Sequence, residues 1–137
     1  MAIKLYNVNE EEYFGSNVYL IHRPFILSNP YTHIKEKHTK ALFLVSTREE
    51  AIESYSHYFD VMYGKNIKFT KTIDEIYEKY RNGDEVLLGC YCDTSKLNGS
   101  YCHGEIIIKK MQSRLLKEKF AEAKKNKKIF GNLKIKD

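Results

Sequence analysis

The chain has 137 residues, of which 42% are hydrophobic and 13% aromatic. This composition is typical of a folded globular protein and excludes an intrinsically disordered one. The length indicates one domain with its own core. The formal net charge is +5, and much of the excess lies after Lys109. We therefore expect an anionic partner.

No stretch of 18 apolar residues is present, and the N-terminus lacks the apolar run of a signal peptide. The chain has three cysteines. An odd number without a secretion signal favours reduced thiols over a disulfide framework. We expect a cytoplasmic protein with no membrane partner.

The first half of the chain predicts strands around a stiff loop. Residues 3–8 alternate in polarity, and residues 17–21 are β-branched and aromatic, so both segments predict strands. Residues 22–31 hold both prolines of the chain, and proline restricts its own backbone and that of its predecessor. Residues 41–45 predict a further short strand.

Two helices are predicted next. Ser46 or Thr47 begins a capping box, and Gly64 ends the helix that follows. The aromatic side chains of this helix, Tyr55, Tyr58 and Phe59, recur at helical spacing and are predicted to be core. Thr72 predicts the cap of a second helix, which ends at residues 82–83. Residues 86–88 then form a short buried strand.

The C-terminal part is basic. After Gly104, apolar residues continue at helical spacing to about Lys125, and residues 110–137 form a basic helix and tail. The lysine run at 124–128 indicates either a solvated helix end or a tail that contacts phosphates. Residues 129–135 predict a last edge strand. The alternation of strands and helices over residues 1–137 predicts a three-layer α/β domain with a mainly parallel sheet.

All three cysteines lie around one strand, one loop and one helix start. Cys90 and Cys92 are two residues apart, so on a strand they point to the same face. Cys102 and His103 open the last helix, whose N-terminus carries a partial positive charge that lowers a thiol pKa and attracts anions. The sequence therefore predicts a functional site here.

Three interpretations of this cluster stay open. Cys90, Cys92, Cys102 and His103 supply the ligand set of a zinc site, although their spacing differs from the usual two-to-four-residue gaps. Alternatively, Cys102 beside His103 is a reactive thiol, with Glu105 as an acid, a base or a capping carboxylate. In the third interpretation the cysteines are packed core residues.

The chain resembles the domain-of-unknown-function 4326 family over roughly residues 17–110. The family shows Gly-Arg-Pro after a strand, Gly-Asn-Pro-Phe, a Thr-Arg-Glu-Glu helix start, Leu-x-Cys-Trp-Cys and Cys-His-Gly-Asp. The matching segments here are His22-Arg23-Pro24, Ser28-Asn29-Pro30-Tyr31, Thr47-Arg48-Glu49-Glu50, Leu88-Gly89-Cys90-Tyr91-Cys92 and Cys102-His103-Gly104-Glu105. His22 and Ser28 replace glycines, Tyr91 a tryptophan and Glu105 an aspartate. The resemblance implies a small Rossmann-like α/β fold and a bacterial or phage origin.

In parallel sheets, ligands bind beyond the carboxyl ends of the strands. We therefore predict a nucleotide- or nucleoside-directed enzyme or binding protein, whose pocket joins the loop around Arg23 and Asn29 to the cysteine cluster. Arg23 would pair with phosphate or carboxylate, and Asn29 and Tyr31 would contact the rest of the ligand. The alternatives are a phage protein that binds a host protein, with structural or zinc-bound cysteines, and a nucleic-acid-binding module that uses the lysine-rich tail.

Overall fold

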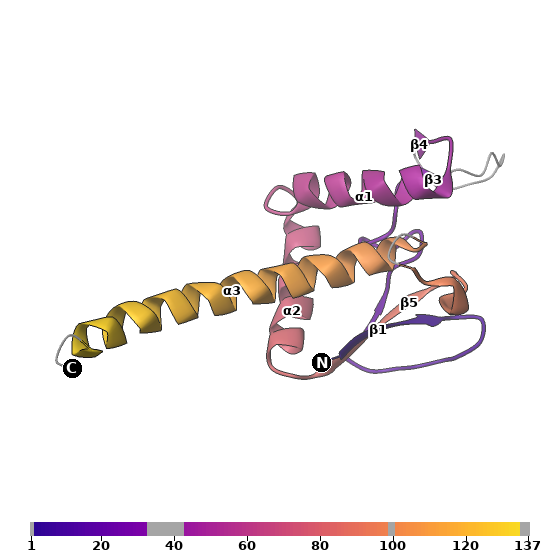
Figure 1. The fold of residues 1–137 in the computed structure, drawn as a ribbon. Helices are drawn as coiled ribbons and strands as arrows, with labels where there is room; N and C mark the ends of the chain where they lie inside the picture. The colour runs from indigo at the N-terminus through magenta and orange to yellow at the C-terminus, as the bar shows by residue number, and fades with distance from the viewer. Residues whose placement is uncertain (1, 33–42, 99–100, 135–137) are drawn as a thin grey trace.

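The structure is a computed structural model that describes residues 2–32, 43–98 and 101–134 (Figure 1). Its main sheet has three parallel strands in the order β1-β5-β2, namely β1 (Ala2–Asn7), β5 (Glu85–Cys90) and β2 (Val18–Leu20). Leu88 of β5 is in register with Leu5 of β1 and Tyr19 of β2. The predicted α/β fold with a mainly parallel sheet is confirmed.

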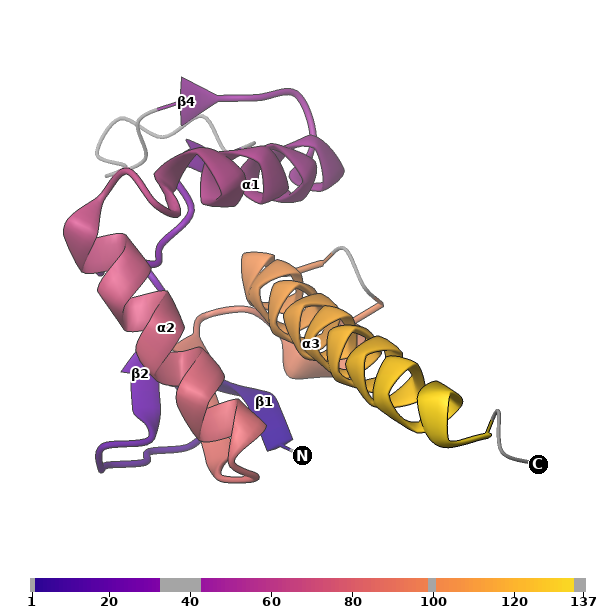
Figure 2. The same ribbon diagram turned by 90° about the vertical axis from the view of Figure 1, so that its left-hand side faces the viewer.

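One face of this sheet is covered by helices. Three buried side chains of β5, Val86, Leu88 and Cys90, face a core that includes Ile73 of α2 (Ile67–Arg81) and Ile107 of α3 (His103–Lys134). Figure 2 shows α2 crossing over the strands, with α3 beside it. The helices supply the apolar surface that this sheet face needs in order to be buried.

The opposite sheet face carries Tyr6, Leu20 and Gly89. A Cβ atom on Gly89 would lie 2.8 Å from the Tyr6 hydroxyl and 2.9 Å from Leu20 Cδ2, so these two side chains close over the glycine. Within the described residues no helix covers this face, because residues 8–17 return from β1 to β2 without forming one. The described part of the chain therefore has two layers, and the predicted third layer has no counterpart in it.

Helix α1 (Arg48–Met62) begins and ends as its sequence predicts. The Thr47 side chain accepts a hydrogen bond from the Glu50 amide at 3.0 Å, and Gly64 follows the helix with a φ of 91°. Tyr55 is fully buried, which confirms it as core. A two-stranded sheet of β3 (Tyr31–Thr32) and β4 (Phe43–Leu44) lies beside α1, and residues 41–42 of the predicted strand are outside the described range.

Two predicted element boundaries were wrong. Helix α2 begins at Ile67 rather than at Thr72, because the Asn66 side chain caps it by accepting from the Phe69 amide at 2.9 Å. The Thr72 hydroxyl instead donates to the Lys68 carbonyl within the helix. The predicted C-terminal strand is also wrong over residues 129–134, which are helical because α3 continues to Lys134, and residue 135 is outside the described range.

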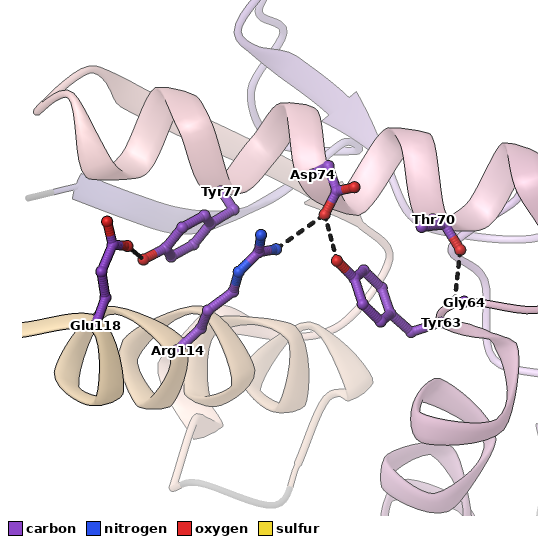
Figure 3. Close-up of polar contacts among 7 residues, drawn as sticks. All are labelled: Tyr63, Gly64, Thr70, Asp74, Tyr77, Arg114 and Glu118. Atoms are coloured by element: carbon purple, nitrogen blue, oxygen red, sulfur yellow. Dashed lines mark hydrogen bonds and ion pairs between the residues drawn. The ribbon is translucent and has the colours of Figure 1, made fainter. Parts of the chain in front are cut away.

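Polar contacts fasten α3 to α2 (Figure 3). The Arg114 guanidinium lies 3.9 Å from the centre of the Tyr77 ring and donates to Asp74 Oδ1 at 2.9 Å. One turn later, Glu118 accepts a hydrogen bond from the Tyr77 hydroxyl and pairs with Arg81 Nε at 2.8 Å. These contacts fix the direction of α3 over the core.

In the part of the chain that the structure describes, no helix combines the length and the apolar character needed to span a membrane.

Candidate metal centre

Three thiols converge at the carboxyl end of β5. Cys90 is the last residue of β5, Cys92 follows two residues later, and Cys102 immediately precedes α3. Their Sγ atoms all lie within 4.8 Å of one another. Cys90 and Cys102 are buried, whereas Cys92 is partly exposed. The cysteines predicted as metal ligands are therefore brought together, and they could hold a metal ion.

The backbone around the cluster holds these sulfurs in place. The Cys90 thiol donates to the Tyr6 carbonyl oxygen at 3.7 Å, and the Gly104 amide donates to Cys102 Sγ at 3.4 Å. The Gly104 amide thus points at the Cys102 sulfur from the start of α3, an arrangement that suits a sulfur ligand of a metal ion.

The thiols divide into one acidic and two weakly acidic groups. Hydrogen bonds from Cys102 and Cys90, with a contribution from the positive charge of Arg48, lower the pKa of Cys92 to about 2. The hydrogen bond from Cys102 lowers the pKa of Cys90. The hydrogen bond of Cys90 to Cys92 and the burial of Cys90 have the larger combined effect and raise that pKa to about 11. Hydrogen bonds to Cys90 and Cys92, together with burial, raise the pKa of Cys102. These shifts favour the thiolate of Cys92 over those of Cys90 and Cys102.

His103 lies beside the thiols but does not belong to the group of converging ligand atoms. Its side chain is 8% exposed, and Nε2 donates to the Ile21 carbonyl oxygen at 2.8 Å. Burial lowers its pKa to about 4, so the imidazole is neutral at pH 7. Its ring centre lies 4.8 Å from that of Tyr55. The predicted fourth metal ligand instead joins the end of β2 to the start of α3.

Glu105 was predicted as an acid, a base or a capping carboxylate, and its contacts are those of a capping carboxylate. Its Oε2 atom accepts hydrogen bonds from the backbone amides of Tyr101 at 2.8 Å and Cys102 at 3.0 Å. These are amides at the start of α3, which lack partners within the helix. Glu105 therefore acts as a capping carboxylate that fixes the backbone of Cys102.

The loop between β2 and β3 is braced by its own polar groups. Arg23 Nη1 donates to the Asn29 carbonyl at 2.8 Å, and Asn29 Nδ2 donates to the Ala51 carbonyl at 3.1 Å. Asn29 Oδ1 accepts from the Tyr31 amide at 2.9 Å, and the Tyr31 ring stacks on Phe43 with centres 5.1 Å apart. Asn29, predicted as a ligand contact, is buried and fastens the loop to α1.

Two arginines shift pKa values at the site, one on a thiol of the cluster and one on His103 beside it. The positive charge of Arg23 contributes to lowering the pKa of His103, and that of Arg48 contributes to lowering the pKa of Cys92, in both cases after larger effects. Arg48 also donates to the Tyr101 carbonyl at 3.2 Å, with its guanidinium 4.2 Å from the centre of the Tyr101 ring. Arg48 was not predicted as a site residue. Its place in the Thr-Arg-Glu-Glu segment, which resembles the family, could have indicated a role at the site.

Comparison with known proteins gives one match. The model of a protein family described as "Domain of unknown function (DUF4326)" matches residues 3–113, which include the three cysteines, His103 and both arginines. No curated protein and no solved structure matches the chain.

Proposed function

This chain belongs to the DUF4326 family, a domain of unknown function, and from its own site we propose that it binds a zinc ion through Cys90, Cys92 and Cys102, with an anionic ligand of the nucleotide class beside it. The convergence of the three Sγ atoms is the observation that carries this proposal.

The sulfur positions support a thiophilic metal. Zinc–sulfur bonds of about 2.3 Å in a tetrahedral site place sulfurs about 3.8 Å apart. The Sγ atoms here lie within 4.8 Å of one another, so only small side-chain movements are needed to reach that geometry. Soft thiolates favour zinc over hard cations such as magnesium and calcium.

The number of ligands supports a site that takes a further group. Structural zinc sites have four protein ligands, whereas sites with three leave a position for water or substrate. Within residues 2–32, 43–98 and 101–134, only the three cysteines converge on this point. We therefore propose that the fourth position receives water or a donor atom of a bound ligand.

The surrounding charges support an anionic ligand. Arg23 and Arg48 come from two different segments; Arg48 acts on Cys92 of the cluster and Arg23 on His103 beside it. The start of α3, with its partial positive charge, lies at the same place. In parallel α/β sheets this position, beyond the carboxyl ends of the strands, is where nucleotides bind.

Elemental analysis of the purified protein, with thiol titration on the same sample, tests the metal. We expect about one zinc per chain and protected thiols, and loss of the zinc in Cys92→Ser. Tyr91→Phe, a change at the exposed neighbouring residue, is the control and keeps the metal. If the wild-type protein binds no zinc even in a zinc titration and all three thiols react freely, the metal proposal is wrong.

Calorimetric titration of the zinc-loaded protein with AMP tests the anion site. We expect Arg48→Gln to weaken AMP binding at least tenfold. Arg81→Gln removes the same charge at an exposed position on α2 and leaves the affinity unchanged. No binding of AMP, or equal losses in the two variants, would overturn the nucleotide part while leaving the zinc result standing.

A further inference from the structure

The net charge of the protein is concentrated at one end of the chain. Residues 1–116 contain fifteen basic and fifteen acidic residues, so their formal charge is zero. Residues 117–137 contain eight basic and three acidic residues, which gives +5, the net charge of the whole protein. This segment follows residues 3–113, which match the family. The charge is thus a property of an extension and not of the family domain.

The extension is the part of α3 that leaves the body of the protein. Glu118 makes the contacts with Tyr77 and Arg81 of α2, and the helix then continues to Lys134, about 24 Å further at 1.5 Å per residue. Figure 1 shows this orange-to-yellow half of α3 running on beyond α2. Every described side chain from Lys119 to Lys125 is exposed.

We propose that this projecting half of α3, defined as residues 117–134 and called the basic arm, binds duplex DNA. A double helix is a regular array of phosphates, and its major groove admits an α-helix with phosphates on both flanks. The exposed lysines of the arm match such a surface, because at 100° per residue Lys117, Lys119 and Lys125 point in three different directions around the helix.

The same distribution argues against a membrane surface as the partner. A helix that lies in a lipid interface separates a broad apolar face from a charged face. In the arm, Lys124 and Lys117 lie 40° and 60° from Phe120 on one side of the helix axis, and Lys119 lies 100° from it on the other side, so lysines border Phe120 on both sides.

The type of basic residue predicts how the arm binds. All eight basic residues of 117–137 are lysines. Lysine contacts phosphates as a point charge, whereas arginine is the residue that most often recognises guanine in the major groove. Binding is therefore independent of sequence and strongly dependent on salt, since each phosphate contact releases counterions.

The test is fluorescence anisotropy with a labelled 20-base-pair duplex of arbitrary sequence, from 50 to 200 mM salt. The arm variant replaces Lys117, Lys119, Lys124 and Lys125 by glutamine. The control variant replaces four exposed lysines of the body, Lys65, Lys68, Lys71 and Lys96, and so has the same net charge. Both variants keep the cysteines, so their zinc content shows whether the metal centre is unaffected.

We expect the wild-type protein to bind two unrelated duplexes equally. The arm variant should lose at least tenfold in affinity at 100 mM salt, and its log–log salt slope should fall by about one for each lysine that contacts a phosphate. The control variant should stay within twofold of wild type. Equal losses in the two variants, or binding to vesicles of anionic phospholipid without binding to DNA, would overturn the proposal.

Discussion

The imidazole of His103 donates from Nε2 to the carbonyl oxygen of Ile21 at 2.8 Å, and so joins the first residue of α3 to the residue that follows β2. The bond is buried, and a carbonyl oxygen can only accept, so Nε2 carries the proton. The side chain is therefore committed to positioning the cysteine centre between two parts of the fold.

His103 makes the stability of the metal-free protein depend on pH. Its pKa is about 4 in the folded protein, against an ordinary value of 6.5, so the unfolded chain binds a proton first as the pH falls. The free energy of unfolding should decrease from pH 6.5 to about 4, by about 2 kcal/mol between pH 7 and 5. Urea unfolding of the wild type and His103→Gln at both pH values, with chelator present, measures this.

In His103→Gln, the free energy of unfolding should not show the decrease between pH 7 and 5 that is due to His103. His57→Gln, which changes an exposed histidine of α1, should keep all of it. The same pH dependence in the wild type and in His103→Gln would contradict a neutral buried imidazole.

Glu105 is expected to stabilise the start of α3. Glu105→Ala removes the acceptor of two backbone amides, Tyr101 and Cys102, and should cost about 1 to 2 kcal/mol in urea unfolding. Glu105→Gln retains an acceptor oxygen and should cost less. Glu122→Ala, at an exposed position on the same helix, should be nearly neutral. If Glu105→Ala is as stable as the wild type, Glu105 is not a cap.

Gly104 lets the first turn of α3 approach the sheet. An added Cβ would lie 2.8 Å from Ile21 Cδ1 and closer still to Leu5 Cδ2. Gly104→Ala should therefore cost about 1 to 3 kcal/mol. Because Leu5→Ala removes the nearest obstacle, the double variant should cost at least about 1 kcal/mol less than the sum of the single changes.

A second pair supplies the control for this cycle. Gly104→Ala combined with Leu116→Ala, an exposed residue farther along α3, should be additive. Additive costs for Gly104→Ala and Leu5→Ala as well would show that the two positions do not meet.

Zinc binding should release protons from the cluster. At pH 7 Cys92 is a thiolate, whereas the raised pKa values of Cys90 and Cys102 keep these two thiols protonated. Zinc binds thiolates, so about two protons should leave, and the apparent affinity should rise about 100-fold per pH unit around neutrality. Calorimetry in two buffers of different ionisation enthalpy gives the number of protons released. Release of no protons, or of three, would contradict this division of the thiols.

The sequence predicted those elements whose signals are local. The capping box at Thr47, the terminating Gly64 and the strand before Cys90 depend on neighbouring residues and were found. The start of α2 was missed because Asn66 and Thr72 are both good caps, and only the packing of Phe69 and Ile73 into the core decides between them. That helices cover only one face of the main sheet could not be predicted, because it depends on contacts between residues that lie far apart in the sequence.

The site was predicted in part for the same reason. The close spacing of Cys90 and Cys92 could be read from the chain, although β5 ends at Cys90 and Cys92 lies just beyond the strand, and Cys102 could be placed at a helix start. The direction of the His103 ring could not be predicted, since it depends on where the carbonyl of Ile21, the residue after β2, lies in the fold. Asn29 resembled a ligand contact because nothing local shows that the Ala51 carbonyl lies beside it.

The strand order has a consequence for how the protein is made. In the main sheet, β1 and β2 pair only with β5, which ends at Cys90. A nascent chain that has left the ribosome as far as α2 thus holds two strands with no partner from this sheet. The sheet and the cysteine cluster are completed late and almost together, since Cys102 follows twelve residues after Cys90. Nascent chains in which β5 has not yet been made should therefore expose the unpaired edges of β1 and β2. We expect such chains to depend on chaperones during synthesis.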